Sequence, residues 1–76
     1  MPKLKVLSGK DIIKMFSAFG FVYHTTKGSH VHMKYKDILA TIPLHNEIKR
    51  GTLKAIYRQA LVVIPKDQLD VMFYTK

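Results

Sequence analysis

Three short runs of strand-forming residues, separated only by turn signals, constrain the fold of this 76-residue chain more than any other feature. Residues 21–26 are rich in aromatic and β-branched side chains, and residues 30–35 alternate polar with apolar without a break. The third run, residues 38–42, stops at a proline. Because only Lys27-Gly28-Ser29 and Lys36-Asp37 separate these runs, the sequence predicts a three-stranded antiparallel sheet joined by two tight turns.

The alternation of apolar residues also predicts the register of the first hairpin. A three-residue turn at positions 27–29 pairs position 26 with 30, 24 with 32 and 22 with 34, whereas a slip of one residue would bury histidine among aromatic side chains. One face of the sheet then carries Phe21, Tyr23, Thr25, Val31, Met33 and Tyr35, joined by Ile38, Ala40 and Ile42 from the third strand. The opposite, open face carries Val22, His24, Thr26, His30, His32 and Lys34.

Helical spacing of apolar residues predicts one helix before the sheet, one after it and a short one at the end. Ser8 and Asp11 have the pattern of a capping box, and Gly20 closes the first helix. The second helix opens at Gly51-Thr52, and Pro65 suits the first position of the third. The apolar stripes are Ile12, Met15, Phe16 and Phe19, then Leu53, Ile56, Tyr57 and Ala60, then Leu69, Met72 and Phe73. The expected fold class is α+β, in the order αβββα with a short C-terminal helix, and with both main helices on the apolar face of the sheet.

Composition indicates one small domain over residues 1–76, with its core in residues 7–60 and a C-terminal extension in residues 61–76. Hydrophobic residues make up 47% of the chain, which supports a globular core. The absence of cysteine excludes disulfides and thiolate zinc sites. The longest apolar run, residues 60–64, is too short to span a membrane, and no apolar segment follows the basic start as in a signal peptide. We therefore expect a cytoplasmic protein with no membrane association.

The charge is strongly positive and unevenly distributed. Thirteen Lys and Arg residues against five Asp and Glu give a net charge of +8. The last sixteen residues hold Lys66 and Lys76 against Asp67 and Asp70, so the whole surplus lies in residues 1–60. The first sixty residues therefore favour a polyanionic partner, while the neutral tail is suited to packing or to a protein partner.

The candidate catalytic group is His30, which follows Gly28-Ser29 at a tight turn into a strand. Glycine allows both the turn and the close approach of a ligand. Imidazole is the side chain best suited to proton transfer near neutral pH, and RNA supplies its own nucleophile in the 2′-hydroxyl. His32 is a candidate for the second proton transfer or for a contact with substrate. Three histidines on one face, His24, His30 and His32, also allow a zinc site with an open position, although no carboxylate lies near in sequence to orient it.

The second helix predicts a phosphate-binding surface. Lys49 and Arg50 precede its N-terminus, where free backbone N–H groups and the helix dipole attract anions. Lys54 and Arg58 form an i, i+4 pair outside the apolar stripe. Lys10 and Lys27 complete the set of candidate RNA-binding residues. The aromatic positions Tyr23, Tyr35 and Tyr57 fall on apolar faces, so we assign them to the core rather than to base stacking.

These features together resemble the HicA toxins, which are small metal-independent mRNA interferases of toxin–antitoxin systems. The matching blocks are Ser8-Gly9-Lys10, Gly20-Phe21, Lys27-Gly28-Ser29-His30, Ile42-Pro43-Leu44-His45, Lys49, Gly51-Thr52-Leu53, Ile56 and Gln59-Ala60. The resemblance implies a fold like that of double-stranded-RNA-binding domains, His30 as the single catalytic residue, no metal or other cofactor, and a HicB-like antitoxin partner. The chain departs from the family at Leu61, where relatives commonly have glycine, and this places the packing of the tail in question.

The sequence therefore favours an endoribonuclease toxin that cleaves mRNA. Two alternatives remain open. A non-catalytic RNA-binding module would share the fold. An inactive toxin would bind only its antitoxin.

Overall fold

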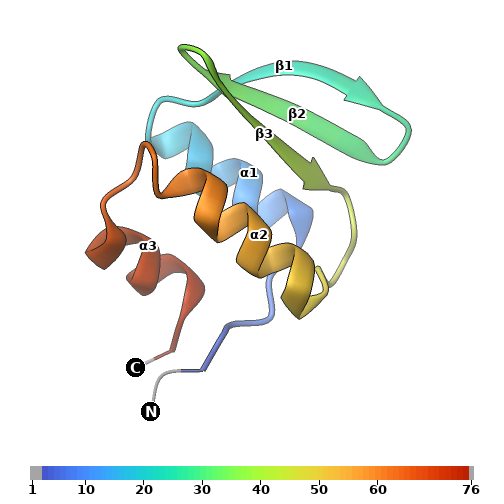
Figure 1. The fold of residues 1–76 in the computed structure, drawn as a ribbon. Coiled ribbons are helices and arrows are strands. Elements are labelled where there is room, and N and C mark those ends of the chain that lie inside the picture. Colours follow the sequence, from blue (N-terminus) through green and yellow to red (C-terminus); the bar gives the residue numbers. More distant parts are fainter. Residues whose placement is uncertain (1–2, 76) are drawn as a thin grey trace.

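The computed structural model describes residues 3–75 and contains three helices and three strands in those residues. The elements in chain order are α1 (Gly9–Ala18), β1 (Val22–Lys27), β2 (His30–Tyr35), β3 (Ile38–Pro43), α2 (Arg50–Ala60) and α3 (Lys66–Phe73). The strands form one antiparallel sheet in the order β1-β2-β3. Helices α1 and α2 cover the same side of the sheet, and α3 lies beside α2 (Figure 1). The predicted α+β class and element order are confirmed.

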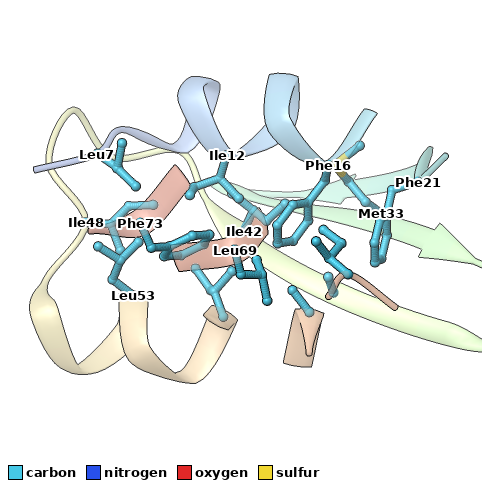
Figure 2. Packing of buried hydrophobic residues seen from close by; sticks show 14 of the residues in the cluster. Leu7, Ile12, Phe16, Phe21, Met33, Ile42, Ile48, Leu53, Leu69 and Phe73 are labelled. Atoms are coloured by element: carbon cyan, nitrogen blue, oxygen red, sulfur yellow. The ribbon is translucent and has the colours of Figure 1, made fainter. Parts of the chain in front are cut away.

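The core lies between the sheet and the helices. Side chains of α1, β3, α2 and α3 meet there, and Phe16, Ile42 and Phe73 are fully buried (Figure 2). From α3 and the turn before it, Ile64 and Leu69 are also buried. Burial of each such side chain contributes about 2 kcal/mol, so the C-terminal segment stabilises the fold as part of the core.

The ends of α1 are formed as its sequence predicts. The Ser8 hydroxyl accepts from the Asp11 N–H at 3.2 Å, and the Asp11 carboxylate accepts from the Ser8 N–H at 3.0 Å. The second of these bonds holds the pKa of Asp11 below its ordinary value. Gly20 follows the C-cap with a φ of 101°. The starts of the other two helices differ slightly from prediction. Helix α2 begins one residue earlier, at Arg50, and Pro65 is the N-cap of α3 rather than its first residue.

The predicted register of the first hairpin is wrong near the turn. Val22 pairs with Lys34 as expected, but His32 pairs with Thr25 and His30 pairs with Lys27. A bulge inserts one extra residue in β1 between Tyr23 and Thr25, and the turn is correspondingly shorter than three residues.

The bulge reverses the faces of the second half of β1. Because paired residues share a face, Thr25 lies on the side of His32, and Thr26 lies on the side of Val31. In agreement with this, the Thr26 and Tyr23 hydroxyls lie 2.7 Å apart. His24, at the bulge, has no partner on β2. The side chain of Tyr23 is 64% exposed, so its assignment to the core is wrong, because β1 is the strand farthest from α2 (Figure 1).

The two ends of the described chain are joined beside α3. The Lys5 N–H donates to the Phe73 carbonyl, and the Thr75 N–H donates to the Lys3 carbonyl, each at 2.7 Å. In the same region the Tyr57 hydroxyl donates to the Asp70 carboxylate at 2.5 Å. No helix within residues 3–75 is long and apolar enough to cross a lipid bilayer.

Asp70 links α2 to α3 and should make stability sensitive to acid. Its carboxylate also pairs with Lys66 at 2.7 Å, and the bonds from Lys66 and Tyr57 lower the pKa of Asp70. A folded-state pKa below the unfolded value adds stability that is present above the unfolded pKa and is lost as pH falls through the folded pKa. We expect D70N to melt at lower temperature than the wild type at pH 7, and the difference to shrink as the pH falls below the ordinary pKa of an aspartate.

Melting curves at several pH values test this expectation. D67N, which removes a carboxylate from the first turn of the same helix, is the control. A gap between wild type and D70N that does not change with pH would contradict the assignment.

Candidate active site

A hollow of about 310 Å³ lies where the end of the sheet meets α2. Its walls come from the start of β2, the end of β3, the loop after β3 and one stripe of α2. The lining residues are His30, Thr41, Pro43, His45, Thr52, Ala55, Ile56 and Gln59. The volume is at the lower end of the range for small-ligand sites, and two imidazoles, two hydroxyls and one amide side chain give it polar chemistry.

His30 is positioned by the β1–β2 turn and by its pairing with β3. Gly28, in the turn, has a φ of 58°, which favours glycine, and no atom lies within 4 Å of the position of a Cβ there. His30 opens β2, faces Pro43 across the ladder and is exposed. The Ser29 carbonyl accepts from the Leu44 N–H at 2.6 Å, which ties this turn to the loop after β3.

His45 lies in the loop after β3 and is held by α1. Its carbonyl accepts from the Gly9 N–H at 3.0 Å, while its side chain is exposed. Gly9 is buried against the same loop, and a Cβ at this position would lie 2.2 Å from the Pro43 carbonyl oxygen. The absence of a side chain at Gly9 therefore allows α1 to approach the loop closely enough to hold it.

His32 occupies a supporting position. Its ring is half-buried, and its Nδ1 is hydrogen-bonded to the Thr41 Oγ1 at 3.1 Å. Thr41 lines the hollow but His32 does not. This contact suits His32 to orienting the wall of the hollow.

The N-terminus of α2 borders the hollow through Thr52. The N-cap, Lys49, makes no side-chain capping bond, and the first turn contains no acidic residue. The N–H groups of this turn are therefore available to an anion, and the exposed Lys49 and Arg50 add positive charge. By contrast, the N-terminus of α1 is occupied by the Ser8–Asp11 capping box.

The structure gathers only some of the residues predicted for the site. His30 lies in the hollow, and Lys49 and Arg50 lie at the adjoining helix end. Lys54 and Arg58 are exposed, but the hollow is lined by positions 52, 55, 56 and 59, and 3.6 residues per turn place 54 and 58 on other sides of α2.

The other predicted residues also lie outside the lining. Lys10 and Lys27 are exposed and do not line the hollow. Within residues 3–75, no three His, Cys, Asp or Glu side chains are close enough together to hold a metal ion, so His24, His30 and His32 do not form the alternative zinc cluster.

Four polar lining residues had no predicted role: Thr41, His45, Thr52 and Gln59. Three of them, His45, Thr52 and Gln59, stand in blocks that resemble HicA proteins, and this was the available signal in the sequence.

A larger hollow, of about 740 Å³, lies near the paired chain ends, but most of its polar side chains are already engaged. Asp70 accepts from Tyr57 and Lys66, and the Lys5 ammonium donates to the Val71 carbonyl at 2.9 Å. The bond to Asp70 raises the pKa of the Tyr57 phenol, and the same carboxylate raises the pKa of Lys66. These contacts stabilise α3 and leave the smaller hollow as the candidate for chemistry.

The fold and the site together define a small basic α+β protein with a histidine-bearing hollow beside an anion-attracting helix end. A family model described as the HicA toxin of bacterial toxin–antitoxin systems matches residues 9–62. The match covers most of the chain, so the chain belongs to the HicA toxin family. As a toxin of such a system it has an antitoxin as partner. No curated protein matches the chain significantly.

Proposed function

We propose that this toxin is an endoribonuclease that cleaves mRNA, with His30 as a catalytic residue and without a metal ion or other cofactor. The observation that carries the proposal is the hollow that joins the exposed His30 imidazole to the uncapped, cation-flanked N-terminus of α2. Proton transfer and phosphate binding are the two functions that RNA cleavage requires of a protein, and this arrangement provides for both in neighbouring places.

The 2′-hydroxyl of RNA can attack the adjacent phosphorus, so the protein needs no nucleophile of its own. It has to hold the phosphate, accept the 2′ proton and protonate the departing 5′-oxygen. Imidazole at His30 suits either proton transfer near neutral pH. Gly28 and Ser29 place no bulky side chain beside it, which leaves room for a nucleotide.

Basic residues around the hollow would hold the RNA backbone. Lys49 and Arg50 stand at the phosphate-attracting helix end. The remaining candidates are exposed, do not line the hollow and would contact flanking nucleotides: Lys10, Lys27, Lys54 and Arg58. We assign His32 to support of the wall through Thr41.

A HicB-like antitoxin in the cytoplasm would neutralise the toxin, as the resemblance to HicA proteins implies. The proposal places both its target, mRNA, and its antitoxin in that compartment.

Cleavage by the purified chain tests the proposal. A mixed-sequence RNA incubated with the protein in excess chelator should be cut to fragments that end in 2′,3′-cyclic phosphate. The all-deoxy version of the same sequence should stay intact, because it lacks the attacking hydroxyl. Loss of cleavage in chelator, restored by a divalent ion, would contradict the proposal, as would cleavage of the deoxy substrate.

Lys49 and Arg50 should dominate the salt dependence of RNA binding. Each phosphate that a protein neutralises on a single strand adds about 0.7 to the slope of log K against log salt, so the K49Q/R50Q double variant should reduce that slope by about 1.4. Binding is measured with 2′-O-methyl RNA, which cannot be cleaved. The control is K3Q/K66Q, which removes equal charge near the paired chain ends. Equal slopes for the two double variants would show that net charge alone governs binding.

The alternative of a non-catalytic RNA-binding module makes a different prediction. Such a protein would bind 2′-O-methyl RNA with the same salt dependence, yet would leave natural RNA uncut. The cleavage assay therefore distinguishes the endoribonuclease from the RNA-binding module, whereas a measurement of affinity does not.

A further inference from the structure

Two histidines line the same hollow, although they are fifteen positions apart in the sequence. The backbone joins their segments directly, because the Ser29 carbonyl, just before His30, accepts from the Leu44 N–H, just before His45. A second bond, from the Gly9 N–H to the His45 carbonyl, fixes the loop from the other side. Both imidazoles are exposed and therefore reach a substrate that enters the hollow.

We propose that His45 is the second proton-transfer residue of the site, acting with His30 as a general acid–base pair. This inference rests on the proposed function, since it assigns a role within RNA cleavage. It replaces the single-histidine site with one in which each proton transfer has its own imidazole.

The reaction balances without any further reactant. One neutral imidazole takes the proton of the 2′-hydroxyl as the 2′-oxygen forms its bond to phosphorus. The bond from phosphorus to the 5′-oxygen breaks, and the other imidazole, in its protonated form, gives its proton to that oxygen. The products are a 2′,3′-cyclic phosphate and a free 5′-hydroxyl, and the two histidines have exchanged protonation states, which solvent then resets.

The surroundings favour His45 over other partners for His30. No lysine, arginine, carboxylate or tyrosine lines the hollow among residues 3–75, so the two histidines are its titratable groups. His32 lies outside the lining, and its Nδ1 is engaged by Thr41. His24 stands at the bulge of β1 and is also absent from the lining, which makes it a matched control.

The variant H45A should lower kcat for RNA cleavage by about 10²–10⁴-fold, the usual contribution of a general acid or base. Its affinity for 2′-O-methyl RNA should stay within about twofold of wild type. H24A should retain full activity. H45N and a circular dichroism spectrum check that any loss is not a loss of fold, since asparagine keeps a polar side chain at this position.

A substrate with sulfur in place of the bridging 5′-oxygen identifies the two roles. A thiolate leaves without being protonated, so this substrate restores cleavage to a variant that lacks the general acid but not to one that lacks the general base. We expect it to rescue one of H30A and H45A and not the other. Rescue of both or of neither would overturn the pairing.

Other results separate this inference from the proposed function. If H30A is inactive while H45A keeps kcat within about threefold of wild type, or loses affinity alone, His45 is not a proton-transfer residue and the proposed function stands. If H30A itself cleaves RNA at the wild-type rate, the assignment of the hollow as the active site fails, and the inference with it.

Discussion

Replacing His30 by alanine should lower the rate of RNA cleavage by at least about 10³-fold. A single general acid or base contributes about 10²–10⁴-fold, and loss of one member of a coupled pair also leaves the other without its partner step. His30 is exposed at the start of β2 and makes no side-chain hydrogen bond among the described residues, so folding should be unaffected. Single-turnover kinetics on a labelled RNA measure the change, and the melting temperature of the same sample checks the fold.

The double variant H30A/H45A sharpens this expectation. Residues that act as a unit show strongly non-additive losses, so the double variant should be little slower than H30A alone. If the fold-loss in rate of the double variant equals the product of the fold-losses of H30A and H45A, the two histidines act independently. The inactive H30A sample, purified in the same way, also shows that cleavage does not come from a contaminating ribonuclease.

The fold was predictable because local signals along the chain agree with one another. The alternating pattern of residues 30–35, the Ser8–Asp11 capping box and Gly20 each specify structure through contacts within a few residues. The bulge at His24 was not predictable in this way. Its sequence, Tyr23-His24-Thr25, suits a regular strand equally well, and the extra residue is visible only when β2 lies beside it.

The candidate site was predictable in part, for the same physical reason. His30 was identified because the Gly28-Ser29 turn directly precedes it, and Lys49 and Arg50 because they open a helix. His45 stands in a loop with no periodic pattern, and its place in the hollow depends on contacts with Gly9 and on the link between Leu44 and Ser29. Such contacts join residues far apart in sequence, so composition and spacing do not reveal them.

Gly9→Ala should destabilise the protein more than the addition of a single methyl group suggests. The added Cβ would lie 2.2 Å from the Pro43 carbonyl oxygen and 3.0 Å from the Leu44 Cα. Both are backbone atoms, so no side-chain rotation relieves the contact, and α1 must move away from the loop. Overpacking of this kind costs about 3 kcal/mol, at the upper end of its usual range. For a chain of this length we expect the melting temperature to fall by roughly 12–24 °C.

Gly51→Ala is the matched control, because it makes the same chemical change in the first turn of α2, where no atom lies within 4 Å of the new Cβ. Alanine is favoured over glycine in a helix by up to about 1 kcal/mol, so this variant should be as stable as the wild type or slightly more stable. The two substitutions are therefore expected to change the free energy of unfolding in opposite directions. Equal effects in urea denaturation would contradict the close approach of α1 to the loop.

Gly9→Ala also tests whether α1 holds the loop of the hollow in place. The Gly9 N–H donates to the His45 carbonyl, so displacement of α1 should also release the loop that carries His45. At a temperature where Gly9→Ala is still folded, RNA cleavage should be slower than in the wild type, while binding of 2′-O-methyl RNA should change little, since Lys49 and Arg50 remain at the start of α2. An unchanged cleavage rate in a folded but destabilised Gly9→Ala variant would show that α1 supports the fold without positioning His45.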